Sequence, residues 1–466
     1  MKLGACISSK DNTNIVIDAE DWLGASGRDL SGNAESRAEG LLRANRGVLR
    51  DFEVLASISR TQGRPNLHFK TNGKIGALPL LSPMSGKPDY GLIISPRFGW
   101  DGIGTAMTGA GFRIVPEFLP LPNLPRSDRQ IPAWVISSVV LMRLEKMLKA
   151  LNRRFQLTQE TLSTPKGTIR WNDYASQSIA SARPDRVPCC FPDLTDDYKL
   201  KSFIHYVLLI HRGALQSQRS ASSVIVGLLD LCNSLIAQVS SVTPIMPSNS
   251  FLQNNMRSHV TSKVFRDGLE SIDWTINERG LAGLEATEGL SWRMDMPAFF
   301  EAWCESVLAK LSSDCGLRML TGREEATRVG ITWKIPGTGS QKSLLPDFVL
   351  QGQDKTIIVD AKYKVHAEEI ENHGWWETDD DIKESHRNDM MQVLAYSGLY
   401  EARRTIACLL YPCRQNTYHS LIARNRIIMP AHIAAPRPID FVLGVVPLGG
   451  SSQPTIEAIK DYILAA

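Results

Sequence analysis

Two runs of β-forming residues between positions 344 and 364 constrain the fold of this chain more than any other segment. The sequence LLPDFVLQGQDKTIIVDAKYK places apolar runs on both sides of Gly352–Lys355, which predicts a β-hairpin. Side chains alternate along a strand, so Asp360 and Lys362 share one face, and Asp347 on the paired strand can approach it. The run TIIV before Asp360 predicts that this carboxylate emerges from a buried strand and not from a loop.

Two carboxylates and a lysine in this arrangement suit metal-dependent cleavage of a phosphodiester. Mg²⁺ prefers carboxylate, water and phosphate oxygens, so Asp347 and Asp360 can hold it against the scissile phosphate, with Mn²⁺ as a substitute. The metal acidifies a bound water and stabilises developing charge. Lys362 can orient or deprotonate that water, or compensate the phosphate charge. The alternative is a surface hairpin with ordinary charged residues, because Asp-x-Lys alone occurs often by chance.

Three motifs resemble those of the PD-(D/E)xK nucleases, including their RecB-like branch: Pro346-Asp347, Asp360-Ala361-Lys362 and Gln392-x-x-x-Tyr396. The last motif lies on an expected helix, where residues four apart share a face. The resemblance implies a catalytic set of Asp347, Asp360, Lys362 and Gln392, supported by Tyr396 and Ala361.

The same resemblance implies a further metal ligand, because an acidic residue on the helix before the sheet often completes the site in that superfamily. Pro297 opens an expected helix that carries Glu301 and, one turn later, Glu305. Glu301 is our first choice as the metal ligand beside the two aspartates. A solvent-exposed helix glutamate is the equally plausible alternative.

The amino-acid sequences of the C-terminal motifs are similar to those of one family. DAKYK, NDMMQVLAY and LLYP look like McrC, the nuclease subunit of the McrBC modification-dependent restriction systems. Looser similarities lie upstream at 93–98, 167–170, 186–191 and 195–200. The resemblance implies a DNA endonuclease that acts with a McrB-like AAA+ hexamer, a GTPase or ATPase that recognises and translocates DNA. The N-terminal region then docks into that ring and stimulates hydrolysis, and the C-terminal domain cuts.

Two other hypotheses stay open. The chain is a non-catalytic regulator of an AAA+ ring, with its nuclease fold serving only as a scaffold, or it is a stand-alone repair or recombination nuclease of the same superfamily. The intact Asp/Asp/Lys set argues against the first, and the long upstream region has no docking role in the second.

Breaker residues divide the chain into three expected domains of an α+β multidomain protein. Residues 1–114 are rich in Gly, Ser and Asn with short apolar runs, which predicts a mostly β domain. Five prolines in 115–132 predict an extended connector. Residues 115–290 are expected to be mainly helical, with apolar stripes that pack in a core. Residues 291–466 alternate β runs and helices, which predicts an α/β PD-(D/E)xK core with a mixed central sheet.

The expected elements follow from apolar periodicity. Helices are expected over 133–153, 196–218, 221–242, 254–276, 298–312, 388–403 and 454–466. Strands are expected over 329–335, 345–351, 356–363, 406–411 and 441–446.

Two segments outside these elements are expected to be loops. Gly99–Gly111 is glycine-rich but lacks the lysine of a phosphate-binding loop, and no Gly-x-x-x-x-Gly-Lys-Ser/Thr segment occurs in the chain. The polar, acidic segment 365–388 predicts a solvated insertion loop. Its alternative is a lid on DNA or a partner, with Trp375 and Trp376 stacking on bases or packing against protein. A helper base among its histidines is a further hypothesis: His366, His373 and His386.

Composition sets only broad limits. A charged fraction of 22% and a formal net charge of +3 are those of an ordinary globular protein and neither support nor exclude a DNA partner. The eight cysteines show no zinc-site spacing and are expected to be reduced. No signal-peptide core or bilayer-spanning run occurs, so a cytoplasmic protein without a membrane partner is expected.

Overall fold

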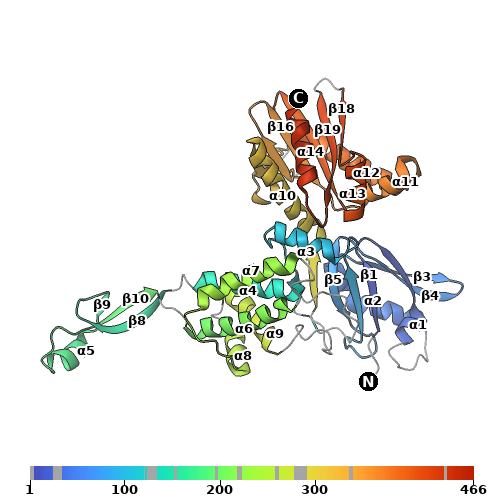
Figure 1. Ribbon diagram of the computed structural model, residues 1–466. Helices are drawn as coiled ribbons and strands as arrows, with labels where there is room; N and C mark the ends of the chain where they lie inside the picture. Colours follow the sequence, from blue (N-terminus) through green and yellow to red (C-terminus); the bar gives the residue numbers. More distant parts are fainter. Residues whose placement is uncertain are drawn as a thin grey trace. The chain divides into compact units, whose positions relative to one another are not determined.

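The structure is a computed structural model that divides by internal contacts into two compact units (Figure 1). One unit comprises 1–132, 220–224 and 284–466, and the other comprises 133–219 and 225–283. The residues described are 5–24, 34–119, 121–122, 134–151, 155–194, 198–217, 223–257, 262–277, 291–334, 340–434 and 438–465. The three expected domains, 1–114, 115–290 and 291–466, stay a prediction.

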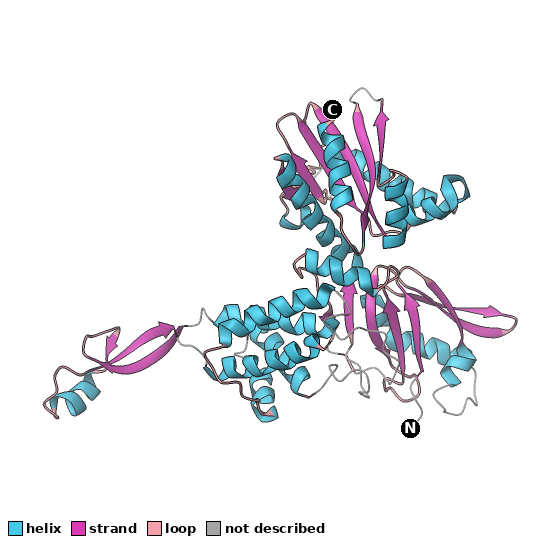
Figure 2. Cartoon of the chain, in the orientation of Figure 1, coloured by secondary structure: helices cyan, strands magenta, loops and turns pink. Residues whose placement is uncertain are grey.

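A six-stranded sheet organises the C-terminal part of the first unit (Figure 2). Its strands, in spatial order, are β12 (Arg318–Thr321), β15 (Phe348–Gln351), β16 (Lys355–Ala361), β17 (Arg404–Cys413), β19 (Ile439–Pro447) and β18 (Ile428–Ile433). The β16–β17 and β17–β19 pairs are parallel and the others antiparallel. The sheet is therefore mixed, and the α+β class is confirmed.

Five helices surround this sheet. They are α10 (Met296–Cys315), α11 (His366–Glu377), α12 (Asp380–Ser397), α13 (Gln415–Ala423) and α14 (Gln453–Leu464). The helix α10 begins where the Asp295 carboxylate accepts a hydrogen bond from Ala298 N at 2.9 Å, and it ends at Gly316 in the left-handed conformation. Ile358 of β16 packs in one buried cluster with Val393 of α12.

The segment 365–388 is helical, so the loop prediction there is wrong. It forms α11 and the first half of α12, and the Asp379 side chain caps α12 by accepting from Asp381 N at 2.8 Å. The first turn of α11 is buried through His366 and Ala367. Its helices therefore depend on capping and on contact with β17, and the sequence shows no apolar stripe that signals them.

A second sheet in the same unit joins the N-terminal region to the last third of the chain. Its order is β1 (Ala5–Lys10), β6 (Tyr90–Ser95), β5 (Lys74–Leu80), β11 (Trp292–Asp295) and β7 (Glu117–Phe118). A third sheet contains β2 (Asn14–Asp18), β4 (Arg64–Lys70) and β3 (Leu55–Thr61). Because β11 leads directly into α10, the N-terminal sheet fixes the start of that helix.

The N-terminal region also contains helices, which are α1 (Ala19–Gly24), α2 (Ala34–Asp51) and α3 (Trp100–Gly109). The helix α3 overturns the prediction of a flexible loop over Gly99–Gly111. Its glycines allow close packing, because a Cβ added at Gly102 would lie 2.2 Å from the Leu448 carbonyl oxygen, and one at Gly109 would lie 2.2 Å from the Trp303 ring.

The other unit contains a helical group and a small sheet. The helices are α4 (Trp134–Leu151), α6 (Tyr198–Gln216), α7 (Ser223–Val239), α8 (Asn249–Arg257) and α9 (Lys263–Ile276), and the strands are β8 (Phe155–Leu162), β9 (Thr168–Ile169) and β10 (Val187–Leu194). A short helix α5 (Trp171–Asp173) and a π-helical turn (Tyr174–Ile179) follow β9. The apolar residues of α4 are buried, as the core interpretation predicts. The single helix expected over 254–276 is two helices, and residues 258–261 lie outside the described residues.

The remaining strands are short. The strand expected over 329–335 is limited to β13 (Val329–Gly330), which pairs with β14 (Ser343–Leu344). Within the described part of the chain, no helix combines the length and the apolar character needed to cross a bilayer.

The pairing of β5 with β11 yields a stability prediction. A Cβ at Gly76 would lie 2.1 Å from the Trp292 carbonyl oxygen and 2.9 Å from Arg293 Cα, both backbone atoms. We expect Gly76→Ala to lower the free energy of unfolding by about 2–3 kcal/mol, measured by urea unfolding followed by circular dichroism. The control is Gly47→Ala in α2, which meets nothing within 4 Å and should raise stability by up to about 1 kcal/mol. Equal effects of the two substitutions would contradict the packing argument.

Candidate active site

The three residues that the hairpin predicts as catalytic lie together at the end of β16. The antiparallel register pairs Phe348 with Val359, and one further step sets Asp347 opposite Asp360. The Asp347 carboxylate accepts a hydrogen bond from Ala361 N at 2.8 Å, which fixes its side chain against the strand. Ala361 therefore contributes through its backbone.

The backbone of Asp347 is held from the opposite side. Gly322 N donates to the Asp347 carbonyl at 2.8 Å, and Thr327 Oγ1 donates to the Pro346 carbonyl at 2.5 Å. A side chain at position 322 would collide with Pro346, since an added Cβ would lie 2.7 Å from its carbonyl oxygen. Neither Gly322 nor Thr327 could be predicted from the sequence, because they lie in a turn without a recognisable motif.

Asp360 is fully buried, whereas Lys362 reaches the surface. The Lys362 ammonium lies 2.9 Å from Asp360 Oδ2, and 21% of the lysine side chain is exposed. Among the described residues, neither Asp360 oxygen has a hydrogen-bond partner of good geometry. The ion pair with Lys362 is therefore the main interaction that compensates the buried negative charge of Asp360. A buried carboxylate with free lone pairs is costly in a core but suits a divalent cation.

The electrostatics of the two aspartates reflect burial first and neighbouring charges second. Burial and the charge of Asp360 raise the pKa of Asp347 to about 8, against the stabilising hydrogen bond from Ala361 N. Burial also raises the pKa of Asp360, although Lys362 opposes it. For Lys362, burial opposes the charged form, but the charge and hydrogen bond of Asp360, together with the charges of Asp347 and Asp389, raise the pKa. The two carboxylates thus resist joint ionisation unless a further positive charge is nearby.

Of the two glutamates on α10, Glu301 faces the aspartates. Burial raises the pKa of Glu301, Arg323 opposes this, and the negative charges of Glu305 and Asp360 add to it. Glu305 instead forms ion pairs with Arg113 and, at 3.1 Å, with Arg323. Glu301 is half-buried and its charge interacts with that of Asp360, whereas Glu305 is held by arginines. The role of Glu301 as the third acidic residue stays a prediction.

The acidic residues fit Mg²⁺ better than a metal that needs a complete protein cage. No three His, Cys, Asp or Glu side chains of the described residues form a ready cluster for a metal ion. Mg²⁺ is usually bound by one or two carboxylates and completes its shell with water and substrate phosphate. Asp347 and Asp360 can supply those carboxylates. The observation that supports this fit is that the buried oxygens of Asp360 accept no hydrogen bond of good geometry from the described residues.

The predicted residues of α12 form a pair with each other. Gln392 Nε2 donates to Tyr396 Oη at 3.0 Å, and Tyr396 packs in the buried cluster with Val393. The hydrogen bond found for Gln392 therefore goes to Tyr396 and not to either aspartate. Its catalytic role stays a prediction.

A polar network behind Asp360 was missed by the sequence analysis. Lys364 Nζ donates to both oxygens of Asp389, at 2.7 and 2.8 Å, and Tyr411 Oη donates to the same carboxylate at 2.8 Å. Lys364 does not continue the face of Asp360 and Lys362, because β16 ends at Ala361 and the lysine turns towards α12. The charge of Asp389 contributes to the raised pKa of Asp360. The only available signal was the position of Asp389 one helical turn before Gln392.

The three histidines of α11 and α12 face partners other than the catalytic aspartates. His386 Nδ1 lies 2.9 Å from Tyr411 Oη, His366 Nε2 lies 3.8 Å from Asp389, and His373 lies 3.6 Å from Glu369. Burial, with the nearby charge of Lys364, lowers the pKa of His366 to about 4. The helper-base hypothesis stays untested.

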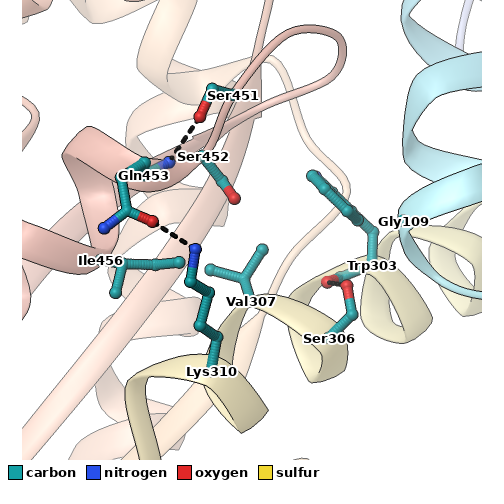
Figure 3. Close-up of a pocket in the computed structure, with 9 residues that line it drawn as sticks. All are labelled: Gly109, Trp303, Ser306, Val307, Lys310, Ser451, Ser452, Gln453 and Ile456. Carbon is teal, nitrogen blue, oxygen red and sulfur yellow. Dashed lines mark hydrogen bonds between the residues drawn. The ribbon is translucent and has the colours of Figure 1, made fainter. Parts of the chain in front are cut away.

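A pocket of about 210 Å³ lies elsewhere, between α10 and the start of α14 (Figure 3). Lys310 donates to Gln453 at 2.5 Å across it. Its lining residues are Gly109, Trp303, Ser306, Val307, Lys310, Ser451, Ser452, Gln453 and Ile456. This lining contains no carboxylate, so the pocket offers no ligand for Mg²⁺.

Comparison with known proteins identifies the family. Residues 117–412, more than half of the chain, match the family described as McrBC 5-methylcytosine restriction system component. The chain belongs to this family. The match spans all of the candidate site, from α10 to Pro412 in β17.

Solved structures give a weaker likeness to McrBC assemblies. One is the refined half-complex from the tetradecameric assembly of Thermococcus gammatolerans McrB AAA+ hexamers with bound McrC, at 14% identity and a TM-score of 0.41, covering 98% of this chain and 100% of that one. Another is the T. gammatolerans McrBC complex, at 13% identity and a TM-score of 0.27, covering 66% and 88%. Both scores are too low to support a structural inference. No curated protein sequence matches the chain.

The raised pKa of Asp347 gives a pH-dependent prediction for the metal-free protein. Because the folded state keeps this proton up to about pH 8 while the unfolded state loses it near pH 4, the free energy of unfolding falls as the pH rises between these values. Asp347→Asn removes this titration. In chelator, its stability relative to wild type should therefore rise towards pH 8, by at most about 1.4 kcal/mol per pH unit.

Urea unfolding at several pH values between 5 and 8 measures this difference. The control is Gln353→Asn in the exposed hairpin turn, which removes no ionisable group and should give a constant difference. A constant difference for Asp347→Asn as well would show that the Asp347 carboxyl titrates alike in both states.

Proposed function

We propose that this chain is the Mg²⁺-dependent DNA endonuclease subunit of a McrBC-type restriction system. The observation that carries the proposal is the juxtaposition of Asp347, Asp360 and Lys362 at the end of one buried strand pair. Family membership supplies the restriction-system context. The reason to expect a cation is that the buried oxygens of Asp360 accept no hydrogen bond of good geometry from the described residues. Burial of the Asp360 carboxylate lowers the stability of the fold, so a purely structural role does not explain why it is there.

The residues have separate roles in the proposed reaction. Asp347 and Asp360 would hold Mg²⁺, which acts as a Lewis acid and lowers the pKa of a bound water, and Glu301 would complete or orient the site. Mn²⁺ should substitute because it accepts the same oxygen ligands. Lys362 carries a raised pKa and is protonated at neutral pH, which favours hydrogen bonding to the water or phosphate over action as the base.

The proposed partner is a McrB-like AAA+ hexamer that hydrolyses GTP or ATP, and the proposed substrate is DNA. The chain contains no Gly-x-x-x-x-Gly-Lys-Ser/Thr motif of its own, so the nucleotide-driven step needs another subunit. We propose that residues 1–290 dock on that ring and stimulate hydrolysis, and that the protein acts in the cytoplasm against foreign DNA.

The two other hypotheses predict different behaviour. A non-catalytic regulator would stimulate the partner without needing Asp360, and a stand-alone repair nuclease would cut without any partner. The preserved Asp347, Asp360 and Lys362 set argues against the regulator, and the family match over residues 117–412 argues against the stand-alone nuclease.

Substitution of Asp360 tests the proposal. With the McrB-like partner, DNA, nucleotide and Mg²⁺, Asp360→Ala should reduce cleavage about a thousand-fold or more, the equivalent of roughly 4 kcal/mol, because the metal loses a ligand. Stimulation of the partner's nucleotide hydrolysis should be unchanged. Gel assays of cutting and phosphate-release assays measure the two activities.

The matched control is Asp354→Ala, which removes an exposed aspartate from the turn of the same hairpin and should leave both activities intact. Cleavage by Asp360→Ala at the wild-type rate would overturn the nuclease assignment. Chelation of Mg²⁺ should stop cutting by the wild type, and Mn²⁺ should restore it.

A further inference from the structure

An arginine from the N-terminal sheet reaches the residue next to the candidate catalytic lysine. Arg97 follows β6, and its guanidinium Nη2 donates to the Tyr363 carbonyl at 2.7 Å. The guanidinium carbon also lies 4.6 Å from the centre of the Tyr363 ring. The two residues are 266 positions apart in the sequence, and Tyr363 directly follows Lys362.

The arginine itself is fixed by a buried aspartate. Asp11 is fully buried, and its Oδ1 accepts from Arg97 N at 2.6 Å while its Oδ2 lies 3.3 Å from Arg97 Nε. Only 9% of the Arg97 side chain is exposed. Arg414, which follows β17, donates to the Arg97 carbonyl at 2.9 Å. A buried ion pair of this kind contributes little net stability compared with apolar residues, so its value lies in holding a specific geometry.

The Asp11–Arg97 ion pair helps to fix the backbone beyond the end of β16. The strand ends at Ala361, and Lys362 keeps one ladder-like bond, from its N–H to the Leu410 carbonyl at 2.9 Å. After that residue the sheet no longer fixes the chain, because Lys364 turns away to α12. The bond from Arg97 to the Tyr363 carbonyl fixes the chain at this point.

We propose that Arg97 is a positioning residue for the nuclease site, which holds the Tyr363 backbone so that the Lys362 ammonium stays beside Asp360. This inference rests on the proposed function. It also means that the N-terminal sheet is needed for cutting itself, and not only for docking a partner.

The test separates positioning from simple stability. Arg97→Met alone would leave the buried Asp11 charge uncompensated and destabilise the fold. The double variant Arg97→Met/Asp11→Asn removes both charges and should stay folded, as shown by its melting temperature. We expect its single-turnover cleavage rate at saturating DNA and Mg²⁺ to fall about a hundred-fold, since small misplacement of a catalytic group has effects of this size.

The other readouts should distinguish a positioning role from a structural one. Half-saturating DNA concentration and stimulation of the partner's nucleotide hydrolysis should match the wild type, so the effect is on the rate of cutting alone. Arg97→Lys keeps the positive charge beside Asp11 but loses the planar fork of donors, and it should restore part of the rate, to within about ten-fold of wild type.

The matched control is Arg404→Met/Asp440→Asn at the other end of β17. That pair is less deeply buried, with Nε and Oδ2 2.7 Å apart, and Arg404 likewise lies over a tyrosine ring, that of Tyr462. Its loss should lower the melting temperature without slowing cleavage.

The inference is overturned if the folded Arg97→Met/Asp11→Asn variant cuts at the wild-type rate, or if the Arg404→Met/Asp440→Asn control slows cutting equally. These outcomes leave the proposed function intact. Absence of Mg²⁺-dependent cutting by the wild-type protein with its partner would instead overturn the proposed function, and the inference with it.

Discussion

The side-by-side placement of two carboxylates at the end of β16 is the constraint on which the rest of the site depends. Asp360 is fully buried and unpaired except for Lys362, and Asp347 shares its surroundings. Burial raises the pKa of both groups, and the charge of Asp360 raises that of Asp347 further, whereas the charge of Asp389 adds to the raised pKa of Asp360. The surrounding elements therefore have to hold the carboxylates together against their repulsion, and the backbone N–H of Ala361 donates a hydrogen bond to Asp347.

Several elements of the first unit contribute to this. Each carries one charged residue near the aspartates and another that forms an ion pair elsewhere. On α10, Glu301 lies towards the aspartates while Glu305 is held by arginines. After β16, Lys362 pairs with Asp360 and Lys364 pairs with Asp389 of α12. Charges of alternating sign thus surround the strand end, and each lysine has its own carboxylate. This separation explains why two lysines so close in sequence need not compete for one partner.

The sequence predicted those features of the site that depend on local pattern. Strand alternation placed Asp360 and Lys362 together, and the hairpin register brought Asp347 to them, because both follow from a period of two and a short turn. What it could not predict depends on distant contacts or on burial without periodicity. The helices of 365–388 carry no apolar stripe, and α3 is rich in glycine, which usually indicates a turn. The approach of Arg97 to Tyr363 joins residues that follow strands of two different sheets, and no local pattern encodes it.

The most direct test of the account is the position of a bound metal. Crystals of the full chain soaked in Mn²⁺ and measured near the manganese absorption edge should show an anomalous peak within coordination distance of both Asp347 and Asp360, with Lys362 adjacent but not bound to the metal. A peak only at other acidic residues, or none at millimolar Mn²⁺ with both carboxylates visible in the density, would contradict the claim that these aspartates share one divalent cation.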